Sequence, residues 1–257
     1  MLRGSAMRLR ALFALGRLYG GLLLFAVICL AWSLPAAVLY YTLPRRIGEP
    51  LGQYVIMMGF RGFLVAVDVA GVVKCDLSAL DALRDERSLV ITTNHPSLID
   101  IVLIASRLPR TVCIMKAGLL NNPLFGMGAR LAGYIRNDSS WSMIRRSVTS
   151  VQAGSQLLIF PEGTRTETLP VSPFKEGFGM IAQRAHAPVQ TVFIETDSRF
   201  LGKGWPLLKT LPLPVVYRVR LGRRFEVDSD SKDFVGELER YYADELRARG
   251  ESGERGA

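Results

Sequence analysis

The chain has 257 residues, which is enough for one sizeable α/β core, or for a core and a membrane-attachment segment. Its formal net charge of +9 implies a partner or surface of opposite sign, and its mean hydropathy of +0.22 favours lipid over nucleic acid. The three cysteines, Cys29, Cys75 and Cys113, lack C-x-x-C spacing, so neither a disulfide framework nor a zinc site is indicated.

The first predicted element is an apolar segment from Leu18 to Leu43, about 26 residues without a charge. This length is enough to cross a hydrocarbon core as a tilted helix. Pro35 lies inside the segment and can kink one spanning helix or turn a shallow re-entrant hairpin, so both topologies stay open. A buried core helix of a soluble protein is the third alternative. Arginines on both sides leave the orientation open: Arg3, Arg8, Arg10, Arg17, Arg45 and Arg46.

A second apolar stretch runs from Tyr54 to Val72 and carries Arg61 near its middle, which favours an interfacial position over a span. We therefore expect residues 1–72 to form a membrane-attachment region. Residues 73–249 are expected to form an α/β domain, and residues 250–257 a disordered tail.

Apolar runs and helical patterns alternate through the rest of the chain. This order predicts an α/β sheet with helices on its faces. Strands are predicted at 88–94, 111–115, 156–160, 189–195 and 215–227, and helices at 98–108, 177–186 and 233–249, with a short helix inside 121–133.

The sequence N-H-P-S-L-I-D at 94–100 allows two interpretations. Ser97 and Asp100 match a helix-capping box, which implies no chemistry. Alternatively, Pro96 holds His95 in extended backbone just outside a helix while Asp100 lies just inside it. The imidazole can then fold back onto the carboxylate, which suits a general base and its orienting acid. On this stretch alone both interpretations stay open.

A second constellation follows the strand predicted at 156–160. The chain breaks there into Pro-Glu-Gly-Thr-Arg, which offers a glycine for close backbone approach (Gly163), a hydroxyl donor (Thr164) and a forked cation (Arg165). Ligands of α/β sheets lie beyond the carboxyl ends of strands, so these groups suit a phosphate. A polar turn with a solvated arginine is the alternative, although Glu162 beside Arg165 makes that alternative less favourable.

Three further cations, Lys116, Arg136 and Lys175, follow predicted elements near the same region, and each taken alone is more often a surface charge than a ligand. Competing motifs are absent from the sequence: it contains neither G-x-S-x-G nor H-E-x-x-H. The G-x-G-x-x-A at 177–182 does not follow a strand and is discarded as a dinucleotide site. His186 is expected at the surface, in a turn between helix and strand.

Together, the two motifs resemble those of membrane glycerolipid acyltransferases of the 1-acylglycerol-3-phosphate acyltransferase type. The family carries N-H-x-x-x-x-D, matched at 94–100, followed by F-P-E-G-T-R, matched at 160–165. Supporting similarity extends over about residues 75 to 225. The resemblance implies a mixed sheet flanked by helices, with N-terminal membrane helices.

The resemblance further implies that His95 is the general base for an acceptor hydroxyl and that Asp100 orients it. Attack is then direct on the thioester of acyl-CoA or acyl-carrier protein, a co-substrate, so neither a further cofactor nor a metal is expected. Lys116 and the loop Glu162 to Arg165 are expected to handle the acceptor phosphate. Membrane lipid and the acyl donor are the expected partners, nucleic acid is not, and the active site is expected to face the cytoplasm from the inner membrane.

Two positions depart from the family pattern. Arg136 fits only loosely the arginine that ends the family's second block, and Thr191 stands where a second proline is usual. Both departures leave the reaction type intact and the acceptor open. A lysophosphatidate-like acceptor is the leading expectation. The alternatives are another acceptor, such as an ornithine-type lipid, and a membrane lipid-binding protein without catalysis.

Overall fold

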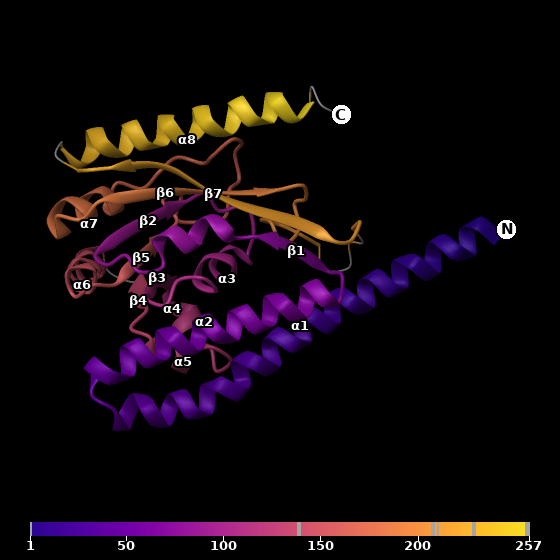
Figure 1. The fold of residues 1–257 in the computed structure, drawn as a ribbon, viewed down its shortest axis with the longest axis horizontal. Coiled ribbons are helices and arrows are strands. Elements are labelled where there is room, and N and C mark those ends of the chain that lie inside the picture. The colour runs from indigo at the N-terminus through magenta and orange to yellow at the C-terminus, as the bar shows by residue number, and fades with distance from the viewer. Residues whose placement is uncertain (1, 138–139, 207–208, 210, 228–229, 255–257) are drawn as a thin grey trace.

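The computed structural model describes residues 2–137, 140–206, 209, 211–227 and 230–254, with side chains described from Leu12 to Ala248. Two long helices come first, and seven strands alternate with shorter helices after them (Figure 1). The helices are α1 (Leu2–Thr42), α2 (Arg45–Val69), the 3-10 helix η1 (Ser78–Leu83), α3 (Asp100–Ala105), α4 (Ala117–Leu120), α5 (Gly126–Leu131), α6 (Ser140–Gln152), α7 (Gly177–Ala185) and α8 (Ser231–Glu254). The strands are β1 (Val73–Asp76), β2 (Leu89–Thr93), β3 (Thr111–Lys116), β4 (Ile135–Asn137), β5 (Gln156–Ile159), β6 (Val189–Thr196) and β7 (Val215–Phe225).

The strands form one mixed sheet in the order β1-β7-β6-β2-β5-β3-β4. β6 and β7 pair antiparallel, and the other neighbours pair parallel. The mixed α/β sheet is therefore confirmed. Because β2, β5, β3 and β4 are consecutive and parallel, their carboxyl ends meet at one edge of the sheet.

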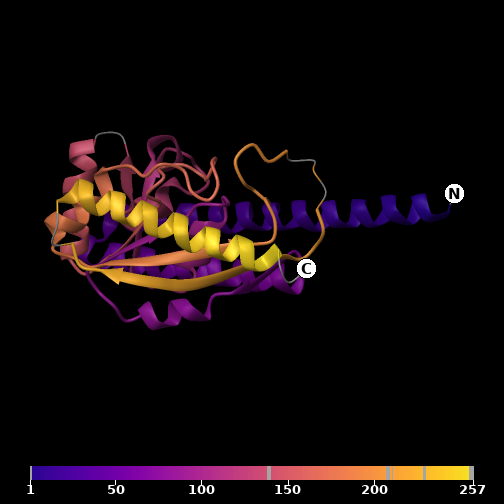
Figure 2. The same ribbon diagram turned by 90° about the horizontal axis from the view of Figure 1, so that it is seen from above.

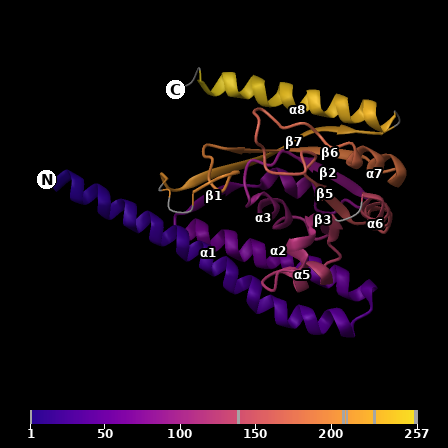
Figure 3. The same cartoon turned by 180° about the vertical axis from the view of Figure 1, so that it is seen from behind.

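Both faces of the sheet are covered, so side chains alternate between two apolar clusters. On β2, Leu89 and Ile91 belong to the cluster that contains α2, η1 and α3. Val90, between them, belongs to the cluster formed with α6, α7 and α8. Every residue of β2 is buried, as expected for a parallel strand packed on both sides. Figures 1 and 3 show α8 along one side of the sheet and α1 with α2 along the other.

The N-terminal region forms a helical hairpin, but its turn is not at Pro35. α1 continues through Pro35 to Thr42, and the chain reverses between Leu43 and Pro44 before α2. A proline inside a helix removes one hydrogen bond, and contacts on both of its sides can hold the helix together. One such contact is the Ser33 hydroxyl, which donates to the Leu124 carbonyl at 2.6 Å. By length and composition alone, Leu12–Thr42 and Arg45–Val69 could each cross a membrane, a test that a soluble protein's core helix can also pass.

The hairpin packs closely against the segment around α5. A Cβ added to Gly52 on α2 would come within 2.7 Å of the Ala132 nitrogen, and one added to Gly128 on α5 would come within 2.7 Å of Trp32. Gln53 also donates to the Ala132 carbonyl at 3.1 Å. α2 therefore meets this segment backbone to backbone at Gly52, and α1 meets it through the Trp32 side chain. The first turns of α1, by contrast, extend away from the rest of the chain (Figure 2).

The ends of the predicted elements match the structure unevenly. The predicted strands all form, and the range 215–227, which could have held one or two strands, forms β7 alone. β1, β4, η1, α4 and α6 were not predicted. α8 continues to Glu254, although disorder is expected from residue 250, and residues 255–257 lie outside the described part of the chain. Each glycine in a helix costs only about 1 kcal/mol relative to alanine, so Gly250 and Gly253 do not stop a helix on their own.

Candidate active site

Asn94 ends β2 by continuing its hydrogen bonds with a side chain. The Asn94 Nδ2 donates to the Ile194 carbonyl at 2.9 Å, and its Oδ1 accepts the Ile194 N–H at 2.8 Å. The amide thus replaces the next backbone pair between β2 and β6. The main chain can then leave the sheet at His95, where Pro96 favours extended backbone.

His95 and Asp100 form the pair that the spacing predicts. α3 begins at Asp100, so His95 lies outside the helix and Asp100 at its first residue. The His95 Nδ1 and the Asp100 Oδ2 are 2.8 Å apart, with the Asp100 side chain fully buried and that of His95 16% exposed. Since Nδ1 faces the carboxylate, Nε2 is the nitrogen left to accept a proton. Pro96 precedes α3 by four residues and lies outside the helix.

A single oxygen of Asp100 both caps the turn at Ser97 and orients His95, the two roles that the sequence offers as alternatives. Oδ2 accepts the Ser97 N–H at 2.8 Å, which caps the turn before α3, and it also binds the His95 imidazole. Capping and orientation therefore coexist, and the either-or interpretation is wrong. Burial raises the pKa of Asp100 above its ordinary value, against the opposing effect of the hydrogen bonds from His95 and Ser97.

The loop 160–166 holds His95 on three sides. The Phe160 ring stacks on the imidazole, with centroids 3.9 Å apart and planes 21° from parallel. The His95 N–H donates to Glu162 Oε1 at 3.1 Å, and the His95 carbonyl accepts the Thr166 N–H at 2.8 Å. Both backbone groups and one ring face of His95 are thus fixed by the second motif. The two motifs that the sequence separates by some 65 residues form one site.

Glu162 makes its contacts inside the protein. It is 1% exposed, and its Oε1 accepts a second hydrogen bond, from the Thr166 hydroxyl at 2.7 Å. Its Oε2 accepts the Ser172 N–H at 2.9 Å. With both oxygens bound to protein groups, Glu162 links the loop to His95. The expected contact of Glu162 with substrate stays a prediction, and positioning is the role that its geometry supports.

Gly163, Thr164 and Arg165 form the outer part of the loop. Gly163 has a φ of +69° in the turn closed by its N–H and the Phe160 carbonyl, a conformation that glycine adopts without strain. Arg165 is half-buried, and its Nη1 donates to the carbonyls of Leu201 and Gly202 at 2.8 and 2.9 Å. One nitrogen of the guanidinium is therefore occupied, and the remaining donors are those that can meet an anion.

Lys116 and Arg136 lie farther along the same edge of the sheet. Lys116 ends β3 and pairs in register with Asn137 on β4, beside Arg136. Since β5 separates β2 from β3, strand spacing alone places the end of β3 roughly 10 Å from that of β2, and β4 roughly 14 Å. Lys116 is exposed and Arg136 is half-buried. The structure therefore aligns both cations with His95, and their contact with an acceptor stays a prediction.

Thr191 is part of the sheet and not of the site edge. It is fully buried on β6, and its hydroxyl donates to the Arg223 carbonyl at 2.6 Å. The register between β6 and β7 shifts at this position, between Gln190 and Val192. The departure from the family's proline is thus accommodated by an irregular strand pair.

Sequence reasoning missed several of these partners. Thr166 holds the His95 carbonyl and Phe160 stacks on its ring, yet neither was assigned a role. Their contacts join residues far apart in the chain, so no local spacing indicates them. His186 lies exposed in the left-handed turn after α7, as expected.

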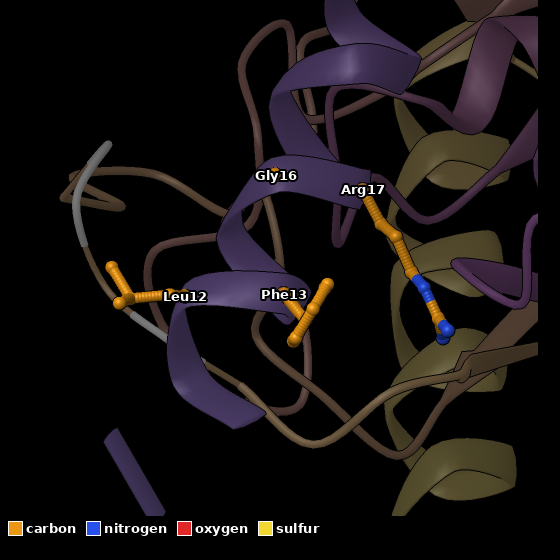
Figure 4. Close-up of a pocket in the computed structure, with 4 residues that line it drawn as sticks. All are labelled: Leu12, Phe13, Gly16 and Arg17. Atoms are coloured by element: carbon orange, nitrogen blue, oxygen red, sulfur yellow. The ribbon is translucent and has the colours of Figure 1, made fainter. Parts of the chain in front are cut away.

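Within the described residues, no group of three His, Cys, Asp or Glu side chains gathers to hold a metal ion. A shallow hollow of about 440 Å³ lies against α1 and is lined by Leu12, Phe13, Gly16 and Arg17 (Figure 4). None of its lining residues belongs to the two motifs.

Comparisons with known proteins show what this chain resembles. Residues 74–195 match the family model described as Acyltransferase. A 1-acyl-sn-glycerol-3-phosphate acyltransferase of Cocos nucifera is 35% identical over 133 residues, which are 48% of this chain and 42% of that protein. The beta form of the human enzyme of the same name is 32% identical over 125 residues, which are 46% of this chain and 45% of that protein. The chain thus spans about half the length of the curated relatives that it matches.

A solved structure extends the likeness in fold beyond the matched residues. The 1-acyl-sn-glycerophosphate acyltransferase PlsC of Thermotoga maritima superposes with a TM-score of 0.67 at 20% identity, covering 93% of this chain and 98% of that one. Residues 74–195 therefore match the acyltransferase family model, the chain resembles 1-acyl-sn-glycerol-3-phosphate acyltransferases over about half of its length, and its fold is that of PlsC.

Proposed function

We propose that the chain is an O-acyltransferase that moves a fatty acyl group from a thioester donor to the free hydroxyl of a lysophosphatidate-like acceptor. The observation that carries the proposal is the 2.8 Å pair of His95 and Asp100, fixed by the loop 160–166 beside a row of cations. Relatives named 1-acyl-sn-glycerol-3-phosphate acyltransferases support the choice of acceptor.

The reaction follows from the free nitrogen of His95. Nε2 takes the proton of the acceptor hydroxyl as its oxygen attacks the thioester carbonyl carbon. The tetrahedral intermediate collapses by breaking the C–S bond, and the leaving sulfur takes the proton back from Nε2. Asp100 holds the imidazole in the required tautomer and stabilises the imidazolium that forms between the two steps. A thioester is already activated, so positioning and a base can suffice.

A covalent route through cysteine has little support in the structure. Burial raises the pKa of Cys75 and of Cys113 to about 12, which leaves very little thiolate at neutral pH. Cys113 is also 2% exposed and packs among apolar side chains. Direct transfer on His95 is therefore the favoured mechanism.

The acceptor phosphate is proposed to lie along the edge between β5 and β4. Lys116 is exposed there and Arg165 presents the donors that Leu201 and Gly202 do not occupy. Phosphate oxygens bind most strongly to charged donors of this kind. We propose acyl-CoA or acyl-carrier protein as donor, because both carry the acyl thioester that this chemistry needs.

We also propose that the hairpin lies on the membrane surface instead of crossing it. α2 packs along the catalytic domain from Gly52, at Ala132, to Val67, in the cluster with β1 and α3. A helix flanked by a polar domain over this length cannot be surrounded by lipid. Each helix nevertheless exposes an apolar stripe, with Leu23, Val27, Leu30, Leu34, Val38 and Tyr41 on α1, and Ile47, Leu51, Tyr54, Met58, Val65 and Val69 on α2. Such one-sided helices are typical of interfacial attachment.

The test is turnover of purified full-length protein with acyl-CoA or acyl-carrier protein across a panel of acceptors. We expect lysophosphatidate to be acylated and His95→Ala to lose at least about a hundredfold in kcat, the usual scale for removing a general base. His186→Asn is the matched control, because asparagine tolerates the left-handed backbone there. If wild-type protein acylated none of the lysophospholipids or glycerol phosphates, the proposal would be abandoned.

A further inference from the structure

Two parts of the chain contact the motif at 94–100 and lie outside residues 74–195, the range that matches the family model. One is the segment 199–202, which follows β6, and the other is Tyr217 on β7. Both meet at Ser97, between His95 and Asp100 in the sequence. From the sequence alone, Ser97 is expected only to cap a helix.

The Ser97 hydroxyl accepts the nearby Ile99 N–H at 3.5 Å and also bonds to two segments that are distant in the sequence. Its Oγ donates to the Phe200 carbonyl at 2.8 Å and accepts the Tyr217 hydroxyl at 3.2 Å. Ser97 and Tyr217 are both fully buried, so water does not replace these partners. The N–H of the same serine donates to Asp100 Oδ2 at 2.8 Å. The backbone group that holds the catalytic carboxylate is therefore itself fixed from two other segments.

The segment 199–202 also reaches the second motif. The Leu201 carbonyl accepts the Leu98 N–H at 3.1 Å and the Arg165 Nη1 at 2.8 Å, and the Gly202 carbonyl accepts the same nitrogen at 2.9 Å. Leu201 has a φ of +55°, which costs a non-glycine residue on the order of 1–3 kcal/mol and persists only where its surroundings enforce it. The strained turn at 199–202 thus bonds to both motifs. These contacts are separate from those by which Glu162 links the two motifs.

We propose that Tyr217 and the segment 199–202 are positioning elements of the active site, which act on Asp100 through Ser97 and on the acceptor through Arg165. The inference rests on the proposed acyl transfer and assigns a role to residues beyond the matched part of the chain. It predicts that these residues affect turnover and acceptor binding beyond any effect on folding.

Two matched pairs of variants test the link to Asp100. Tyr217→Phe removes only the hydroxyl and is expected to lower kcat roughly fivefold, the scale of one buried hydrogen bond. Tyr242→Phe is its control, because Tyr242 is equally buried but belongs to the other apolar cluster, and its hydroxyl bonds to Thr92 and Val192 instead of Ser97. Ser97→Ala is expected to lower kcat by roughly ten- to a hundredfold, whereas its control Ser106→Ala removes a buried hydroxyl that bonds only to Leu103 within α3.

The pH profile distinguishes positioning from loss of stability. A loosened Asp100 stabilises the imidazolium less, so Ser97→Ala should move the acidic limb of kcat to lower pH, and Ser97→Thr, which keeps a hydroxyl, should restore it at least in part. The thermal midpoints of each variant and its control are compared in parallel. A structural role alone would lower the midpoints and leave the limb in place.

Gly202 tests the link to Arg165. A Cβ there would lie 3.0 Å from the Arg199 carbonyl oxygen and 3.3 Å from that of Pro96, so Gly202→Ala should displace the segment and raise KM for the acceptor several-fold. Gly236→Ala on α8 is the control, because its Cβ would meet no atom within 4 Å.

The outcomes are distinct. If Ser97→Ala and Tyr217→Phe lose no more kcat than their controls and keep the wild-type limb, the positioning role is wrong while the acyltransferase stands. If wild-type protein transfers no acyl group, the proposed function fails, and the positioning role fails with it.

Discussion

The carboxyl ends of β2, β5, β3 and β4 form the sheet edge that holds the candidate site, and its two ends differ in how many of their polar side chains are hydrogen-bonded within the protein. At β2 and β5, the side chains of His95, Asp100 and Glu162 bind other protein groups and are buried or nearly so. At β3 and β4, Lys116 is exposed on a strand whose neighbour has only three residues. The first end is built to hold one geometry, as proton transfer requires, and the second leaves its cation available for a ligand.

The comparison makes a kinetic prediction. Substitutions at β2 and β5 should act mainly on kcat, and substitutions at β3 and β4 mainly on KM for the acceptor. Any reversal of that order would mean that the chemistry and the phosphate site have been assigned to the wrong ends.

The largest effect is expected for Asp100→Asn. An asparagine oxygen in the place of Oδ2 can still accept from both Ser97 and His95, but the amide is neutral and stabilises the imidazolium that forms during transfer less than a carboxylate does. The general base is then weakened, and kcat should fall on the order of 10²- to 10⁴-fold with KM little changed. Steady-state kinetics measures this, with Asp81→Asn, a half-exposed carboxylate that pairs with Arg107, as control.

The same variant should be more stable than wild type, and increasingly so as pH rises. Burial raises the pKa of Asp100 in the folded chain, so the folded state binds more protons than the unfolded one above the ordinary pKa of Asp. Wild-type stability therefore carries a cost that is absent below that ordinary pKa and grows as pH rises through the folded pKa. Thermal midpoints at acid and neutral pH check this: a difference between variant and wild type that shrank toward neutral pH would contradict it.

A smaller effect on turnover is expected for Glu162→Gln. The amide NH₂ would face an N–H donor, either that of Ser172 or that of His95, and leave one of them unpaired. We expect about a tenfold fall in kcat and a loss of roughly 1–3 kcal/mol in the free energy of unfolding. Glu167→Gln is the control, since Glu167 is half-exposed and pairs with Lys203 at the surface. If the variant raised only KM for the acceptor, Glu162 would be a ligand after all.

Lys116→Ala should raise KM for the acceptor about tenfold and leave kcat within about twofold, as expected for the loss of one charge-assisted contact to a phosphate. Arg136→Ala should do less, because β4 lies one strand farther from His95. Lys74→Ala, an exposed lysine on β1 at the opposite end of the sheet, is the control. If Lys74→Ala raised KM for the acceptor equally, the effects of all three variants would be explained by the lower net charge alone.

The smallest effect on turnover is expected for substitutions in the hairpin, which contacts α5 just before β4. Leu30→Lys places a charge in the exposed apolar stripe of α1 and should lower sedimentation with lipid vesicles several-fold. Its kcat in detergent should stay unchanged. Trp141→Lys, 65% exposed on α6, is the control. Unchanged vesicle binding by Leu30→Lys would place the membrane face elsewhere.

The same contrast explains what the sequence could and could not reveal. β2 and β5 each contain three consecutive apolar residues, Leu89 to Ile91 and Leu157 to Ile159, which predict buried strands. Pro96 predicts the extended backbone that lets His95 meet Asp100. β4 has three residues, too few for a periodic pattern. α6 has 13 residues and buries Ile144, Ser147 and Val151 at helical spacing, so its pattern is present in the sequence and was missed.

Within the site, local spacing reveals pairs but not shared partners. The sequence cannot show that one oxygen of Asp100 accepts both His95 and Ser97, because each contact alone satisfies a known pattern. The bonds from Ser97 to Phe200 and Tyr217 join residues 103 and 120 positions apart, and they depend on the sheet order. Only folding brings them together.

The contact between Gly52 and Ala132 has a consequence for how the protein would meet its acceptor. Backbone touches backbone there, and three residues later the chain enters β4, which carries Arg136. Because no flexible side chain lies between Gly52 and Ala132, a shift of α2 would displace the segment around Ala132 by a similar distance. On a lipid surface, the depth of the hairpin in the bilayer would therefore set the height of β4 above the bilayer. Binding of an acceptor would then depend on how far its headgroup extends from the membrane.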